Sequence, residues 1–118
     1  MSSLTNYLRS KRKQISLPQE DVAFLLGMKG MNKGAKVSHD EDYSRIPTLE
    51  TALAYEVIYG TAVRELFAGL YEQTAREVSS RAKILSHRKC ETPDPRRQQA
   101  LSELALRYSK AASQLSNT

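Results

Sequence analysis

The sequence predicts an all-α protein. Apolar residues recur three and four positions apart along most of the chain, as they do on one face of a helix. The alternation of apolar and polar residues that marks a half-buried strand is nearly absent. Prolines and glycines fall between the helical segments, where they end one helix and open the next. The 118 residues suffice for one domain with one added element.

The first two predicted helices are short and close together in the chain. Residues 5–14 form the first, which is basic on all but one side. Its apolar face is expected to contain Leu4, Tyr7 and Leu8. Residues 18–26 form the second, because Pro18 suits a first helical turn and Gly27 is a natural stop. The expected buried stripe of this second helix consists of Val22, Ala23, Leu25 and Leu26.

A third helix, short and mostly polar, is expected at residues 35–43. It follows a turn in which Gly30 and Gly34 can reach positive φ without steric cost. Pro47 ends that segment, and the side chain of Thr48 can cap a fourth helix. The period of the fourth helix is carried by Leu49, Ala52, Leu53, Glu56 and Val57, before the stop at Gly60.

The rest of the chain predicts two longer amphipathic helices. The first is expected at residues 61–88, where Gly69 is the one residue that could break a helix. The prolines of the linker CETPDPRR then open a last helix, expected at residues 95–115.

Composition narrows the classes of function. A net charge of +5 and a pI near 9.5 permit nucleic acid, an acidic protein or an anionic surface as partner. No apolar run is long enough to span a membrane, so a membrane is not expected as a partner. The single cysteine, Cys90, fits a reducing cytoplasm, and one cysteine with two histidines makes a zinc site improbable.

An enzyme is not expected from the inventory of side chains. No Ser/His/Asp arrangement or metal-ligand cluster is apparent, and no cofactor motif is complete. The glycine-rich stretch GMKGMNKG follows a predicted helix rather than a strand, and it lacks the final Gly-Lys-Ser/Thr of a phosphate loop. We therefore expect a binding protein without a cofactor.

Two stretches resemble the phage-repressor (Cro/C1, or XRE-type) helix-turn-helix domain. LRSKRKQISLPQEDVAFLLG, at residues 8–27, is similar to that family's first two helices. KVSHDEDYSRIPTLETALAYEVIYGTAVRELF, at residues 36–67, is similar to its recognition helix and the two helices that follow. The resemblance implies a five-helix domain of residues 1–70, whose third helix enters the major groove of DNA. A helical extension of residues 71–118 then lies outside the resemblance. The sequence departs from the family pattern in two places, a lengthened turn at residues 28–36 and the acidic sequence of the third helix.

Contacts to DNA phosphates are expected from five polar side chains. The resemblance implies one from Gln19, at the start of the second helix, and one from Arg9, because the first helix lies beside the backbone. Lys29, Lys33 and Lys36 are expected at the amino end of the third helix, where N–H groups and positive charge attract phosphates. The alternatives are a solvated first helix and lysines that only keep the turn soluble.

Base reading is expected from the third helix, through Ser38, His39 and Asp42. Asp40 and Glu41 are expected to face the second helix and Arg45, with Glu41 paired to Arg45 one turn further on. The alternative is a helix whose acids cap its own amino end and pair with nearby lysines, without reading bases.

The helical extension is expected to need a partner, because two amphipathic helices bury little surface alone. The resemblance implies that this partner is a second copy, which gives a homodimer. The residues expected at the dimer contact are Leu101, Leu104, Tyr108 and Leu115. The alternative is that the last helix folds back on its own chain. Together these features predict a dimeric, sequence-specific binder of double-stranded DNA, a repressor by the resemblance. The competing hypothesis is a helical adaptor or antitoxin-like protein that keeps the fold without reading bases.

Overall fold

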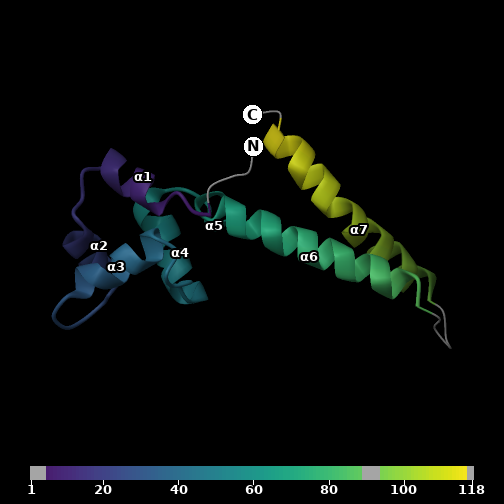
Figure 1. Cartoon of the computed structure of the whole chain (residues 1–118), viewed down its shortest axis with the longest axis horizontal. Helices are drawn as coiled ribbons and strands as arrows, with labels where there is room; N and C mark the ends of the chain where they lie inside the picture. The colour runs from purple at the N-terminus through teal and green to yellow at the C-terminus, as the bar shows by residue number, and fades with distance from the viewer. Residues whose placement is uncertain (1–4, 89–93, 117–118) are drawn as a thin grey trace. The chain divides into compact units, whose positions relative to one another are not determined.

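The computed structural model describes residues 5–88 and 94–116, with side chains described as far as residue 107. Every regular element in these ranges is a helix, which confirms the all-α prediction (Figure 1). The chain divides into two compact units, residues 1–69 and 70–118. None of the described helices combines the length and the apolar character needed to cross a bilayer.

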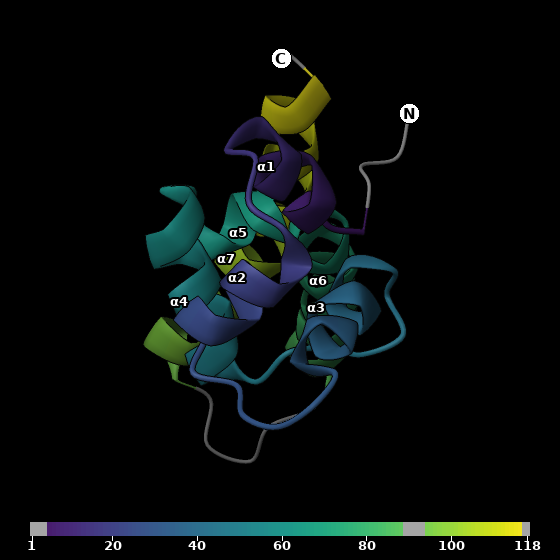
Figure 2. The ribbon, with the colours of Figure 1, turned by 90° about the vertical axis from the view of Figure 1, so that its left-hand side faces the viewer.

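The first unit is built from short helices around one small core. It contains α1 (Leu8–Gln14), α2 (Gln19–Leu25), α3 (Lys33–Glu41), α4 (Leu49–Tyr59) and α5 (Val63–Leu66). α2 and α3 lie side by side, and α1 contacts both α3 and α4 (Figures 1 and 2). The N–H of Tyr7 donates to the carbonyl of Leu66 at 2.7 Å, which joins the two ends of the unit. The fully buried apolar side chains are Leu8, Val22, Ala23, Val37, Tyr55 and Leu66.

The ends of α4 lie where the capping residues predict them. The side-chain oxygen of Thr48 accepts the N–H of Thr51 at 3.3 Å, and Gly60 ends the helix with φ +64°. α3 begins at Lys33, earlier than the expected residue 35, because the left-handed residue that ends the turn is Asn32, with φ +62°. A short polar side chain is the non-glycine type that best tolerates this conformation.

The buried face of α4 differs from the expected one. Leu49, Leu53 and Val57 are 74%, 50% and 83% exposed, whereas Ala52 and Tyr55 are buried. The prediction failed because the sequence LETALAYEVIY is apolar on nearly every side of the helix, so its periodicity does not specify which face packs inward. α2 shows the same kind of error, since Leu25, expected in its buried stripe, is 55% exposed.

The long helix expected at residues 61–88 is wrong in its first part. It is broken at Phe67, whose φ of −114° and ψ of +45° lie outside the helical region. α5 ends before this residue, and α6 (Ala68–Ser86) begins after it. Leu66 and Phe67 are both buried, so the break coincides with the anchoring of these two side chains. No proline or glycine occupies the position of the break, and the apolar period continues across it in the sequence. The helical pattern therefore does not mark the break.

The second unit is an antiparallel pair of helices, α6 and α7 (Pro95–Ser116). The Ser79 hydroxyl on α6 donates to the carbonyl of Leu104 on α7 at 3.0 Å, which requires close approach of the two backbones. Small side chains permit this approach, because Ser79 and Ala82 are the buried residues of α6. Leu101 is the apolar side chain of α7 that is buried among those described.

Candidate functional site

α3 has one face buried in the first unit and one face exposed. The buried face contains Gly34, Val37, Asp40 and Glu41, which lie three, three and one positions apart. On the opposite face, Lys36, His39 and Asp42 are exposed, and Ser38 is half-buried at its edge. Of the predicted base-reading residues, His39 and Asp42 are therefore exposed and Ser38 is partly exposed.

Gly34 lies on the buried face of α3, beside Glu20 of α2. A Cβ at this position would lie 2.9 Å from the Oε1 atom of Glu20, so a larger residue would displace the end of that side chain. The expectation of positive φ is wrong for Gly34, which is helical. It holds for Gly30, whose φ is +98°, and Gly27, with φ +80°, also lies in the turn.

Glu41 joins three helices through its fully buried carboxylate. Arg12 on α1 donates to it twice, from Nε to Oε2 at 2.7 Å and from Nη2 to Oε1 at 3.2 Å. Gln19 on α2 donates from Nε2 to Oε1 at 3.2 Å. The hydrogen bonds from Arg12, with the charge of Glu41, raise the pKa of Arg12. The predicted pairing of Glu41 with Arg45 is wrong, because Glu41 pairs with α1 and α2 while Arg45 pairs with Asp40.

Asp40 is the second buried acid of α3, and it contacts α4. Arg45 donates to it from Nε to Oδ1 at 2.8 Å and from Nη2 to Oδ2 at 3.1 Å, and the Tyr55 hydroxyl donates to Oδ2 at 2.7 Å. Burial, followed by this hydrogen bond to Asp40, raises the pKa of Tyr55. The expectation that Asp40 faces α2 is wrong, although its pairing with Arg45 agrees with the prediction.

Apart from Arg45, the sequence did not reveal the partners of these two acids. Arg12 sits in a basic run whose members look alike, and Tyr55 lies in a helix without a clear apolar face. Asn6, which was also missed, donates from Nδ2 to the carbonyl of Asp40 at 3.0 Å and accepts the N–H of Leu8 at 3.1 Å. One signal for Arg12 was its place on the same helix face as Leu8, one turn away.

Tyr55 and Tyr59 form a matched pair for testing this network. Their rings stack at 5.9 Å, but the buried Tyr59 hydroxyl has no hydrogen-bond partner within the described part of the chain. Burial, with the nearby charge of Glu41, raises the pKa of Tyr59 to about 12. We expect Tyr55→Phe to lower the free energy of unfolding by about 1.5–3 kcal/mol, since it removes a hydrogen bond to a charged group. Tyr59→Phe should leave it unchanged or raise it by about 1 kcal/mol. Urea unfolding measures both, and equal decreases would contradict the assignment.

The predicted phosphate-binding residues do not form one cluster of free cations. The ammonium of Lys33 lies 5.2 Å from the ring centroid of Phe24, where a cation–π interaction orients it. Lys29 and Lys36 are exposed. One N–H of the Gln19 amide is used by Glu41, which leaves the second N–H for another acceptor. The side chain of Arg9 is 54% exposed, with its Nε 3.6 Å from Oε1 of Glu41.

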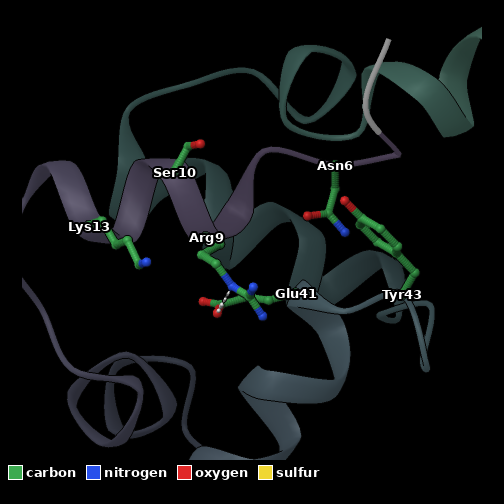
Figure 3. Close-up of a pocket in the computed structure, with 6 residues that line it drawn as sticks. All are labelled: Asn6, Arg9, Ser10, Lys13, Glu41 and Tyr43. Carbon is green, nitrogen blue, oxygen red and sulfur yellow. Dashed lines mark ion pairs between the residues drawn. The ribbon is translucent and has the colours of Figure 1, made fainter. Parts of the chain in front are cut away.

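A hollow of about 230 Å³ lies between α1 and the carboxyl end of α3. Figure 3 shows Arg9 of α1 directed at Glu41, with Ser10 and Lys13 on the same helix. The other lining residues are Asn6 and Tyr43. The charged side chains that line the hollow are Arg9, Lys13 and Glu41, and Arg12 already neutralises Glu41. The hollow therefore carries a net positive charge, which suits an anion such as a phosphate.

The end of α3 is fixed by a local turn. Oδ1 of Asp42 accepts the N–H of Ser44 at 3.0 Å, and hydrogen bonding from Ser44 lowers the pKa of Asp42. Tyr43 takes the left-handed conformation, with φ +71°, which turns the chain away from the helix. Asp42 therefore stays ionised near the exposed His39. Its negative charge repels phosphates, and its oxygens can accept hydrogen bonds from amino groups such as those of bases.

The predicted dimer residues have different positions. Leu101 is 8% exposed because it packs within its own helical hairpin, and Leu104 is half-buried. α7 folds back on α6, as the alternative describes, and Leu101 is buried in that hairpin. The homodimer stays a prediction. The side chains of Tyr108 and Leu115 lie outside the described residues.

Comparisons of this chain with protein-family models, with curated proteins and with solved structures found no match. Within the described residues, no group of three or more His, Cys, Asp or Glu side chains is arranged to hold a metal ion. The candidate function therefore depends on the geometry of α1, α2 and α3.

Proposed function

We propose that this protein is a DNA-binding transcription regulator, a repressor of the Cro/C1 type, that acts as a homodimer in the cytoplasm. In this proposal α1 to α5 form the five-helix repressor-type domain, α2 and α3 are its helix-turn-helix, and α3 enters the major groove. The observation that carries the proposal is the division of α3: two buried acids fix one face, and the other exposes Lys36, His39 and Asp42.

The buried acids argue for a helix whose orientation matters. Burying a carboxylate is costly unless it is paired and fully hydrogen-bonded, and a helix that only filled the core would bury apolar side chains instead. Asp40 and Glu41 each receive several hydrogen bonds, from residues of α1, α2, α4 and the loop after α3. Such bonds fix the rotation of α3, which contacts to base edges require.

The roles of the exposed residues follow from their positions. Base reading is assigned to His39 and Asp42, with Ser38 at the edge of the groove. Phosphate contacts are assigned to Lys29, Lys33, Lys36, Gln19 and Arg9. Lys33 reaches a phosphate without leaving the Phe24 ring only if the DNA backbone passes beside that exposed ring.

Protein binding without base reading is favoured by a separate observation. The α4 stripe of Leu49, Leu53 and Val57 is exposed and apolar, which is typical of a surface that contacts another protein. The first unit is also nearly neutral, with nine Lys and Arg residues against eight Asp and Glu residues in positions 1–69. An adaptor or antitoxin-like protein is therefore the second candidate function.

Salt dependence of duplex binding separates the two candidates. We expect the full chain to bind duplex DNA, with log affinity falling linearly against log salt concentration. Lys29→Gln with Lys36→Gln should reduce this slope by about 0.9 for each phosphate that the variant no longer neutralises. Fluorescence anisotropy at several salt concentrations measures it. The control, Arg76→Gln with Arg107→Gln, removes the same charge from the second unit. No duplex binding by the wild type even at low salt would leave the adaptor as the better account.

A further inference from the structure

The basic excess of this protein belongs to the second unit. Residues 70–118 contain nine Lys and Arg residues against five Asp and Glu residues, whereas residues 1–69 are nearly balanced. A folded unit made of only two helices needs no such excess for its packing. The positions of these basic residues in the second unit therefore indicate what the excess charge is for.

Five of the seven Lys and Arg residues whose side chains are described in this unit lie near the end of α6 or the start of α7. Arg81 and Lys83 lie in the last two turns of α6, Arg88 lies just after it, and Arg96 and Arg97 lie in the first turn of α7. All five are exposed, and we call them the basic tip. The Nε2 atom of Gln98 lies 3.5 Å from the carbonyl oxygen of Ser86, so the two helix ends are adjacent (Figure 1). In the described part of this end, the one acid is Asp94, 3.6 Å from Arg96.

Helix stability accounts for only part of the basic tip. Positive charge at the carboxyl end of α6 is favourable, because the helix macrodipole is negative there. The first turn of α7 is the reverse case, since cations at an amino end oppose the macrodipole, and that turn contains no acid. Asp94 supplies the cap, by accepting the N–H of Arg96 at 2.9 Å, so the arginine side chains have no capping role.

We infer that the basic tip binds the phosphate backbone of duplex DNA, as a second contact in addition to that of the helix-turn-helix. This inference rests on the proposed function. Four of the five cations are arginines, whose guanidinium fork matches a phosphate. The amides of Gln98 and Gln99 donate one N–H each, to the carbonyl of Ser86 and to Glu103, which leaves the second N–H of each for a phosphate. No apolar side chain is present between Arg96 and Gln99, and Ile84, 56% exposed on α6, is a single large apolar side chain rather than the apolar helix face that a lipid surface requires.

The test is the salt dependence of duplex binding by the full chain with the tip altered. Arg96→Gln with Arg97→Gln should reduce the slope of log affinity against log salt by about 0.9 for each phosphate contact, about 1.8 in all. Arg76→Gln with Arg107→Gln, the matched control on the same two helices, should leave the slope unchanged. Arg96→Lys with Arg97→Lys should keep most of it, because the charge is retained. Circular dichroism of each variant confirms that the hairpin is intact.

Two outcomes would overturn the inference. One is a slope in the tip variant equal to that of the control while the wild type still binds DNA, and in that case the proposed function stands alone. The other is loss of binding to phosphatidylserine vesicles in the tip variant with duplex binding unaffected, which would assign the tip to an anionic membrane. Failure of the wild type to bind any duplex would instead remove the proposed function and this inference together.

Discussion

Glu41→Ala should lower the free energy of unfolding by about 3–5 kcal/mol, because it leaves the guanidinium of Arg12 partly buried without its partner. Only 13% of the Arg12 side chain is exposed, and the Glu41 side chain is fully buried. The substitution also removes the acceptor of Gln19, so the one carboxylate that joins α1, α2 and α3 is gone. Urea unfolding followed by circular dichroism measures the effect.

Two further variants identify the cause of this destabilisation. Glu50→Ala removes a carboxylate from the exposed first turn of α4, and it should change stability by less than about 1 kcal/mol. The double variant Arg12→Leu with Glu41→Leu removes both charges, and it should be much less destabilised than Glu41→Ala alone. A double variant as unstable as the single one would show that poorer packing, and not an unpaired charge, causes the effect.

The stability of this network bears directly on the exposed face of α3. His39 and Asp42 are adjacent in sequence to the two acids, Asp40 and Glu41, that fix the inner face of the helix. A helix that rotated by one residue would carry His39 out of the exposed face. The ion pairs thus determine which side chains a ligand meets, and substitutions in them should weaken binding without touching the ligand.

Capping residues and the overall helical pattern were predictable from the sequence. Thr48 and Gly60 fix the ends of α4 by local chemistry, which depends on few neighbours. The buried face of α4 was not predictable, because Leu49, Leu53 and Val57 satisfy the helical period as well as Ala52 and Tyr55 do. The break at Phe67 coincides with burial of its side chain, and the nearest local signal, Gly69, lies two residues further on.

The candidate site was predictable in its outline and not in its pairings. The spacing around Val37 correctly put His39 outside and Asp40 and Glu41 inside. The partner of Glu41 could not be inferred, since Arg45 is a neighbour in sequence while Arg12 is brought close only by the packing of α1 on α3. Long-range ion pairs of this kind depend on helix orientation, which periodicity does not encode.

The most direct measurement concerns the exposed face of α3. A duplex preferred by the full chain is first selected from a random DNA pool, and wild type and His39→Ala are then titrated on it and on a scrambled duplex at one salt concentration. Removing a base contact should weaken binding to the preferred duplex by about 1–3 kcal/mol, or roughly 5- to 150-fold, and change binding to the scrambled duplex little. If His39→Ala binds both duplexes as the wild type does, α3 does not read bases through this residue, and the adaptor function becomes the better account.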